Sequence, residues 1–343
     1  MKLKFYVRTI LVALLLVISL PACSGSGVAQ PTPELVKIKV LSMPYITFAP
    51  FFIAQDEGYF AEQGLEVEFV TFNGLSTAIP ALAQGEIDVV SGHIRASIFS
   101  AISGDAKIKI VADKGYVNST GCADTAIIAR KTLLDSGSLK SPAQLAGLKV
   151  SVDQTNYEGY LMDKILSSVN LTIDNVTLVE DIPSSNQSDA LGSGSVDVLF
   201  SAEPWLTRNL QGGNASLWMA PKELIPDFQY GVVLYGPNLM TKNQDAGKRF
   251  MVAYLKGVRQ YNQGKTDRNI EILSKYTELD NKILKDACWP SIRSDGTINL
   301  QSVMDFQNWA LGRGYIKSLV TSDQLWDSQF VNDAGKKLGT ITP

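Results

Sequence analysis

The sequence predicts an α/β protein with two similar lobes, each a mostly parallel β-sheet flanked by helices. Three observations lead to this prediction. Short β-branched runs alternate with helical patterns, as in parallel sheets with crossover helices. The same order of elements occurs twice along the chain. Behind a predicted leader, about 310 residues of ordinary apolar content remain, which is enough to fill two hydrophobic cores.

The N-terminal residues 1–22 are predicted to be a secretory signal peptide. Three basic residues precede an apolar run over residues 10–20, shorter than the ~20 residues of a membrane-spanning helix. An alanine before Cys23 is the pattern at which lipoprotein signal peptidases cut, so Cys23 is the predicted lipidated (palmitate-bearing) N-terminus. Residues 23–36 then form a polar tether. An ordinary cleaved signal with an incidental cysteine is the alternative.

The charge balance excludes several classes of partner. Of the 31 basic residues, three lie in the leader, which leaves a net charge of about −6 against the 34 acidic residues. The sequence has no Lys/Arg-rich stripe, so neither a nucleic-acid binder nor a protein that docks on anionic lipid is indicated. Membrane contact is expected only through the lipid on Cys23.

The first set of elements follows the tether. Strands are predicted at residues 38–41, 65–70 and 87–90, and helices at 52–63 and 76–83.

The second set repeats this order after residue 145. It comprises strands at residues 148–152, 176–179 and 196–199, and helices at 158–169 and from 187 onward. The motif Ala81-Leu82, Gly85, Ile87, Asp88 and Val89 matches Ala190-Leu191, Gly194, Val196, Asp197 and Val198. Because the spacing from each first strand is nearly equal, we interpret the halves as related lobes. Coincidence between generic βα units is the alternative.

Two cysteines besides Cys23 occur in this sequence. Cys122 and Cys288 would lie in a compartment where disulfides persist, and they are a candidate pair. Two isolated thiols are the alternative, because sequence does not show whether their Cα atoms come within ~7 Å.

Candidate binding residues follow the predicted strands, because parallel sheets bind ligands beyond the carboxyl ends of their strands. The first lobe offers aromatic side chains, a helix start and the single histidine of the sequence. The second offers Asn156 and Tyr157 after its first strand, and Glu203 beside Trp205 after its third. A carboxylate next to an indole suits a ligand with N–H donors and an aromatic body. Helix initiation at Pro204, with Trp205 packed beneath it, is the structural alternative.

No catalytic constellation is evident in the sequence. The G-x-S-x-G, H-E-x-x-H and Walker A patterns are absent, and one histidine cannot supply a His-rich metal site. Nothing in the local sequence brings His93 to Cys122 as a nucleophile and base. We therefore expect no catalytic residue, no metal and no cofactor.

One motif carries a resemblance to a known group of proteins. Residues 48–60, FAPFFIAQDEGYF, followed by EQGLEVE at 62–68, resemble the opening helix and second strand of the periplasmic binding proteins of alkanesulfonate, taurine, nitrate, thiamine-pyrimidine and riboflavin importers. ALAQGEID at 81–88 and DVLFSAEPW at 197–205 are similar too, though less specific. The resemblance covers most of residues 37–335.

The resemblance implies a type II, two-lobe periplasmic binding protein fold. Lobe one would comprise residues 37–130 and 235–335, lobe two residues 131–234, and the tail 336–343. A helix is expected over residues 244–264. The residues expected to line the cleft by family position are Tyr45, Phe48, Asn73, Ser91, Gly92, His93, Asn156, Tyr157, Glu203, Trp205 and Tyr230.

The resemblance also implies a function. The protein would be the monomeric solute-binding subunit of an ABC importer that acts in vitamin uptake. It would work at the extracytoplasmic face of the cell membrane, close its lobes over the solute and deliver the solute to a permease and its ATPase. Aromatic strand ends and a carboxylate favour a planar heterocycle, riboflavin first and a thiamine pyrimidine precursor second. An alkanesulfonate or nitrate is a further alternative, disfavoured because Arg95 is the main cation at the rim. A pyrimidine-synthesising enzyme of this fold is the alternative of another class.

Overall fold

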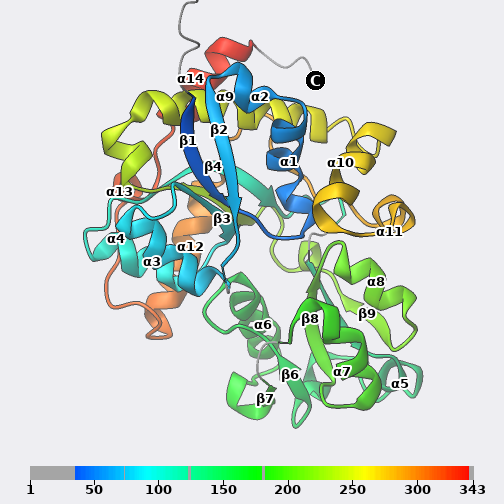
Figure 1. The fold of residues 1–343 in the computed structure, drawn as a ribbon. Helices are drawn as coiled ribbons and strands as arrows, with labels where there is room; N and C mark the ends of the chain where they lie inside the picture. The colour runs from blue at the N-terminus through cyan, green and yellow to red at the C-terminus, as the bar shows by residue number, and fades with distance from the viewer. Residues whose placement is uncertain (1–34, 73, 123–124, 180–181, 340–343) are drawn as a thin grey trace, which may run out of the picture. The chain divides into compact units, whose positions relative to one another are not determined.

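The computed structural model describes residues 35–72, 74–122, 125–179 and 182–339. Their strands form two five-stranded sheets, each flanked by helices (Figure 1). The predicted signal peptide, the lipid site at Cys23, most of the tether and the candidate residue Asn73 lie outside the described residues. No helix in the described part of the chain is long and apolar enough to span a membrane.

The first sheet has the strand order β2-β1-β3-β10-β4. Its strands are β1 (Val36–Leu41), β2 (Leu65–Val70), β3 (Val89–His93), β4 (Lys109–Tyr116) and β10 (Gln229–Tyr235). Strands β1, β2 and β3 pair in parallel, whereas β10 runs antiparallel to both of its neighbours. The sheet is therefore mostly parallel, as predicted, with one reversed strand.

The second sheet repeats this topology with the order β7-β6-β8-β5-β9. Its strands are β5 (Thr125–Arg130), β6 (Lys149–Ser151), β7 (Thr177–Val179), β8 (Val198–Ala202) and β9 (Ala215–Met219). Here β5 is the reversed strand, antiparallel to β8 and β9. The two-lobe α/β prediction is confirmed, and we call the sheets with their helices lobe one and lobe two.

Two strands lie in the lobe opposite to the one predicted. The expected boundaries put Thr125–Arg130 in lobe one and most of Gln229–Tyr235 in lobe two, but β5 belongs to the second sheet and β10 to the first. In each sheet the reversed strand is the one that directly follows the crossover of the chain from the other lobe. A strand's pairing partner depends on long-range register, so local sequence pattern could not reveal this exchange.

Helices cover the faces of both sheets (Figure 1). The first lobe and the C-terminal region contain α1 (Ala49–Asp56), α2 (Tyr59–Glu62), α3 (Leu75–Gln84), α4 (Ala96–Ser103), α9 (Gln244–Tyr261), α10 (Asp267–Thr277), α11 (Asn281–Asp286), α12 (Leu300–Gly312), α13 (Ser322–Leu325) and α14 (Gln329–Leu338). The second lobe contains α5 (Lys131–Asp135), α6 (Tyr157–Ser167), α7 (Gln187–Ser193) and α8 (Trp205–Gln211). The helix predicted over residues 52–63 is two helices, because Gly58 adopts a left-handed conformation with φ 75°.

The repeated aspartates perform the same structural task in both lobes. Asp88 Oδ2 accepts a hydrogen bond from the backbone N–H of Lys39 at 2.7 Å, and the N–H of Asp88 donates to the Lys39 carbonyl. Asp197 makes the equivalent pair of bonds with Lys149, at 3.0 Å through its Oδ2. Each aspartate therefore pins the first strand of its lobe to the third, which supports a common origin of the two halves.

Candidate functional site

A cavity of about 220 Å³ is lined by residues of both lobes. Its walls come from the segments that follow β1, β2, β3, β6 and β7, together with residues of β3, β4 and β8. This location agrees with the rule that parallel sheets bind ligands beyond the carboxyl ends of their strands. The lining residues are Met43, Tyr45, Thr47, Phe48, Gly74, Leu75, Gly92, His93, Arg95, Lys114, Asp153, Asn156, Glu158, Ile182, Pro183, Ser184, Gln187, Phe200 and Ala202.

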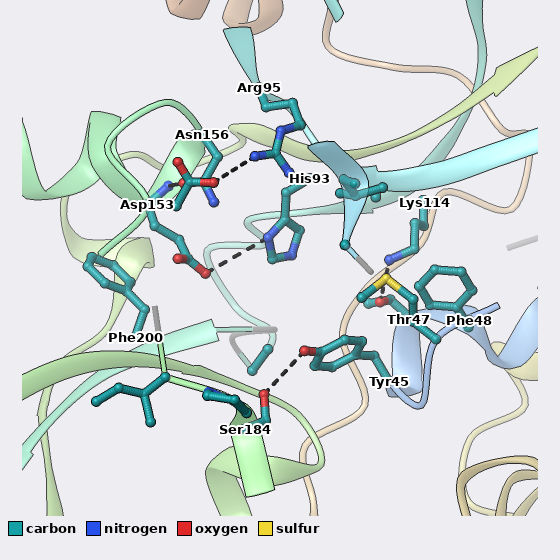
Figure 2. Close-up of a pocket in the computed structure, with 18 of the residues that line it drawn as sticks. Tyr45, Thr47, Phe48, His93, Arg95, Lys114, Asp153, Asn156, Ser184 and Phe200 are labelled. Carbon is teal, nitrogen blue, oxygen red and sulfur yellow. Dashed lines mark hydrogen bonds and ion pairs between the residues drawn. The ribbon is translucent and has the colours of Figure 1, made fainter. Parts of the chain in front are cut away.

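Polar contacts cross the cavity from one lobe to the other (Figure 2). Arg95 Nη2 of lobe one donates to Asp153 Oδ2 of lobe two at 2.7 Å, and both side chains are largely buried. The Tyr45 hydroxyl lies 3.2 Å from the Ser184 hydroxyl. His93 Nδ1 is 3.9 Å from Glu158 Oε1. These contacts hold the rims of the two lobes in register around the space between them.

Lys114 places a buried cation in the cavity wall. It lies in β4 and is only 2% exposed. Its ammonium donates to the Thr47 hydroxyl at 2.6 Å and sits over the Phe48 ring, 4.3 Å from the centroid. A cation at this depth interacts strongly with an acceptor or anionic group, because little water screens it. Lys114 is thus a candidate contact for the polar part of a solute.

Five predicted cleft residues line the cavity. They are Tyr45, Phe48, Gly92, His93 and Asn156. Asn156 also caps α6, since its Oδ1 accepts from the N–H groups of Glu158 and Gly159. Gly92 permits close packing, because an added Cβ would come within 2.3 Å of the Leu75 side chain.

Three predicted residues lie behind the cavity wall. Tyr157 and Tyr230 are each 1% exposed and pack edge-on against the His93 ring, with centroid distances of 4.9 and 5.8 Å. Ser91 is fully buried in β3, one residue before the wall. Edge-to-face packing of this kind fixes the orientation of an imidazole ring. These tyrosines support His93 and do not line the cavity.

The two remaining predicted residues, Glu203 and Trp205, also lie outside the cavity lining. Glu203 is 2% exposed, and its carboxylate accepts hydrogen bonds from the backbone N–H groups of Thr207 and Cys288. Trp205 begins α8, and its ring lies beneath the guanidinium of Arg208 at 5.2 Å. The strand β8 ends at Ala202, which itself lines the cavity, and the chain then turns away.

Sequence reasoning missed several lining residues, of which Lys114 and Phe200 are the most informative. Both lie inside strands, not after them, and the strand-end rule pointed only to the loops. Residues 108–117 carry Lys109, Asp113 and Lys114 in an otherwise apolar strand, and the charged pair at 113–114 was the available signal for Lys114. Buried lysines are rare unless they have a role, so this position marked a candidate site.

Cys122 and Cys288 form a disulfide, with their Cα atoms 5.8 Å apart. The bridge ties the segment that follows β4 to the loop that follows α11. Neither cysteine therefore offers a thiol. Among the described residues, no group of three or more His, Cys, Asp or Glu side chains is placed to hold a metal ion.

The paired sheets and the cavity between them define the class of protein. The two-lobe α/β fold is that of periplasmic binding proteins. The chain belongs to the NMT1/THI5-like family, which matches residues 45–263. YtlA of Bacillus subtilis is 23% identical to this chain over 275 residues. The alignment covers 77% of this chain and 80% of YtlA, which is named as a provisional binding protein.

Solved structures share the fold at low sequence identity. The periplasmic nitrate-binding protein NrtA of Synechocystis PCC 6803 aligns with a TM-score of 0.72 and 16% identity, covering 90% of each chain. The alkanesulfonate-binding protein SsuA of Xanthomonas axonopodis, bound to MOPS, aligns with a TM-score of 0.66 and 16% identity, covering 86% of this chain and 98% of its own. The desulfurization enzyme DSZB aligns with a TM-score of 0.62 and 14% identity, covering 89% of this chain and 100% of its own. Enzymes therefore share this fold.

Proposed function

We propose that this protein is the solute-binding subunit of an ABC importer and that it captures one small molecule between its lobes. The observation that carries the proposal is the cavity at the carboxyl ends of both sheets, lined by each lobe and bridged by polar contacts. Nitrate- and alkanesulfonate-binding proteins among the structural neighbours support this function. Closure of the lobes over the solute would create the form that a permease and its ATPase recognise.

The proposed ligand is a small planar solute with one acceptor or anionic group. Tyr45, Phe48 and Phe200 offer aromatic surface to its flat part, and Lys114 offers a cation to its polar part. Five contacts expected from sequence, at Tyr45, Phe48, Gly92, His93 and Asn156, remain part of this proposal.

The structure changes the basis on which a ligand was expected from the sequence. The Glu203 carboxylate faces backbone N–H groups, so it is not a partner for ligand N–H donors, and Lys114 adds a cation that the strand ends did not reveal. The volume of about 220 Å³ lies below the ~300 Å³ at which pockets for drug-sized ligands begin. We therefore place a single-ring pyrimidine ahead of tricyclic riboflavin, and a small sulfonate or nitrate after both.

Anchoring and assembly complete the proposal. The lipid on Cys23 would hold the mature protein at the extracytoplasmic face of the membrane, and residues 23–36 would let a monomer reach its permease. Globomycin, an inhibitor of lipoprotein signal peptidase, should cause accumulation of a longer precursor, and Cys23→Ala should release the protein from the membrane fraction. Membrane retention of the Cys23→Ala variant would contradict the anchor.

Binding without turnover is the proposed activity, although DSZB shows that the fold also serves enzymes. Both described cysteines are joined in the disulfide. Incubation with a pyrimidine, riboflavin or a sulfonate should return each compound unchanged by mass spectrometry. Product formation that disappears in His93→Ala would instead establish an enzyme.

Thermal unfolding with and without each compound tests the ligand. A solute at about 100 times its Kd raises the unfolding free energy by ~2.7 kcal/mol. We expect this stabilisation with 4-amino-5-hydroxymethyl-2-methylpyrimidine or a related single-ring compound, and its loss in Lys114→Met. The matched control is Lys109→Met, on the same strand but outside the cavity. Equal loss in both variants would contradict the assigned site.

A further inference from the structure

Glu203 contacts lobe one through backbone groups on two separate segments. Its main-chain carbonyl accepts a hydrogen bond from the N–H of Ile46 at 3.2 Å. Its Oε1 accepts from the N–H of Cys288 at 3.0 Å. Glu203 itself follows β8 of lobe two and is 2% exposed. One buried residue thus receives donors from two parts of the opposite lobe.

Both donors are held firmly by lobe one. Ile46 is fully buried in the core of that lobe, directly after Tyr45, which lines the cavity. Cys288 is tied by its disulfide to Cys122 and is followed by Trp289, which stacks on Tyr261 of α9 at 5.3 Å. The Tyr261 hydroxyl donates to the Pro290 carbonyl at 2.7 Å, so the loop that carries Cys288 is fixed to the helix.

The carboxylate is oriented from its own lobe. Thr207 donates to Glu203 through its N–H at 3.1 Å and through its hydroxyl at 3.0 Å, which fixes both carboxylate oxygens. A hydrogen bond to a buried carboxylate is stronger than one between neutral groups, because the charge is poorly screened. The contact with Cys288 is therefore charge-assisted and held in place on both sides.

We propose that Glu203 is a positioning residue for solute capture: with the amides of Ile46 and Cys288 it forms an interlobe latch that stabilises the closed arrangement without touching the solute. The inference deepens the proposed function, since it assigns the closure step to named groups. The disulfide acts in the latch by holding Cys288 where the Glu203 carboxylate can reach its N–H. Removing the carboxylate should release both segments, because both bonds depend on the same approach of the lobes.

Amide hydrogen exchange of the full-length, disulfide-intact protein tests the latch without any ligand. In Glu203→Ala, exchange should rise about tenfold or more at Cys288, as expected for loss of a bond to a charged group. The decisive readout is Ile46, whose acceptor is the backbone carbonyl that the substitution leaves in place. A coupled latch raises exchange at Ile46 as well, whereas a purely local role for Glu203 leaves Ile46 protected and overturns the proposal.

A conservative variant and a matched control complete the exchange experiment. Glu203→Gln retains the shape of the side chain but loses its charge, so it should raise exchange at the Ile46 and Cys288 amides by a smaller factor than Glu203→Ala. It replaces Glu203→Ala in the test if the alanine variant does not fold. The matched control is Gln211→Ala, which removes another bond between the same regions, from Gln211 Nε2 to Asp286 Oδ2 at 2.9 Å on the surface. The control should leave Ile46 and Cys288 unchanged; equal effects in Gln211→Ala and Glu203→Ala would overturn the assignment.

A binding measurement separates this inference from the proposed function. With 4-amino-5-hydroxymethyl-2-methylpyrimidine as probe, Glu203→Ala should increase the dissociation rate about tenfold and leave the association rate within twofold, because the latch acts after encounter. An unchanged dissociation rate would contradict the latch even if the wild type binds. If the wild type does not bind the probe, the ligand proposal fails, while the exchange experiment still decides the latch.

Discussion

The two lobes share one scaffold but contribute different chemistry. Each has three parallel strands, a reversed fourth strand and an aspartate that pins its first strand to its third. Lobe one supplies Tyr45, Phe48, His93 and Lys114 to the cavity. Lobe two supplies two carboxylates, two amides and one hydroxyl, together with Phe200 and three smaller apolar residues. The comparison teaches that the repeated aspartates maintain the scaffold, whereas the side chains that line the cavity differ between the lobes.

The largest expected effect on stability comes from removing the disulfide between Cys122 and Cys288. Cys122 and Cys288 are 166 residues apart, and all the strands of lobe two lie between them in the sequence. Replacing both cysteines with serine should lower the free energy of unfolding by roughly 4 kcal/mol, with the loss confined to global unfolding. Denaturant titration measures it; a loss below ~1 kcal/mol would contradict this account.

A pH dependence is expected in lobe one. Burial raises the pKa of Asp113 to about 6 from an ordinary value of 3.8. Between these values the folded state binds a proton that the unfolded state does not. The unfolding free energy should therefore fall by about 3 kcal/mol as pH rises from well below 3.8 to well above 6, with about 2 kcal/mol of the loss between these two values. Asp113→Asn should remove this dependence. Urea titrations at several pH values check it; an unchanged slope in the variant would exclude Asp113.

Lobe two provides the comparison for that experiment. Its outer strand β9, at the place that β4 occupies in lobe one, has the sequence ASLWM and contains no titratable residue. Hydrogen exchange should therefore show the pH effect in the strands of lobe one first.

The paired aspartates test the common scaffold. Asp88→Ala and Asp197→Ala each leave a backbone N–H and a side-chain donor without their acceptor, so each should cost about 2 kcal/mol of stability. Exchange at the β1 amides should increase in the first variant and at the β6 amides in the second. Unequal costs, differing by more than ~1 kcal/mol, would show that the two halves do not use this residue equivalently.

The smallest expected effect concerns the cavity rim. Tyr45→Phe removes one hydroxyl that bonds Ser184 across the lobes and retains the aromatic ring. We expect solute affinity to fall about threefold to fivefold, the equivalent of ~0.5–1 kcal/mol, by calorimetric titration. The Ser184→Ala variant should match it, because both changes break the same bond; a double variant that loses twice as much would contradict a shared contact.

The sequence predicted the scaffold better than the site. The repeated motif with Asp88 and Asp197 identified six parallel strands, because local pattern and a constant spacing specify them. The exchange of β5 and β10 between sheets depends on long-range pairing, which no local pattern encodes. Of the residues that the strand-end rule proposed, Tyr45, Phe48 and His93 line the cavity, whereas Glu203 and Trp205 lie outside its lining, because the rule does not give the direction of a side chain. Lys114 lies inside a strand, so the rule did not point to it.

Native mass spectrometry of the full-length protein, purified without denaturation from cells grown in rich medium, tests the central claim most directly. We predict a one-to-one complex with a small solute, released on denaturation, present in Lys109→Met and absent or at least about tenfold depleted in Lys114→Met. A protein without bound solute that none of the tested compounds stabilises, or a solute retained equally by both variants, would contradict capture in the cavity between the lobes.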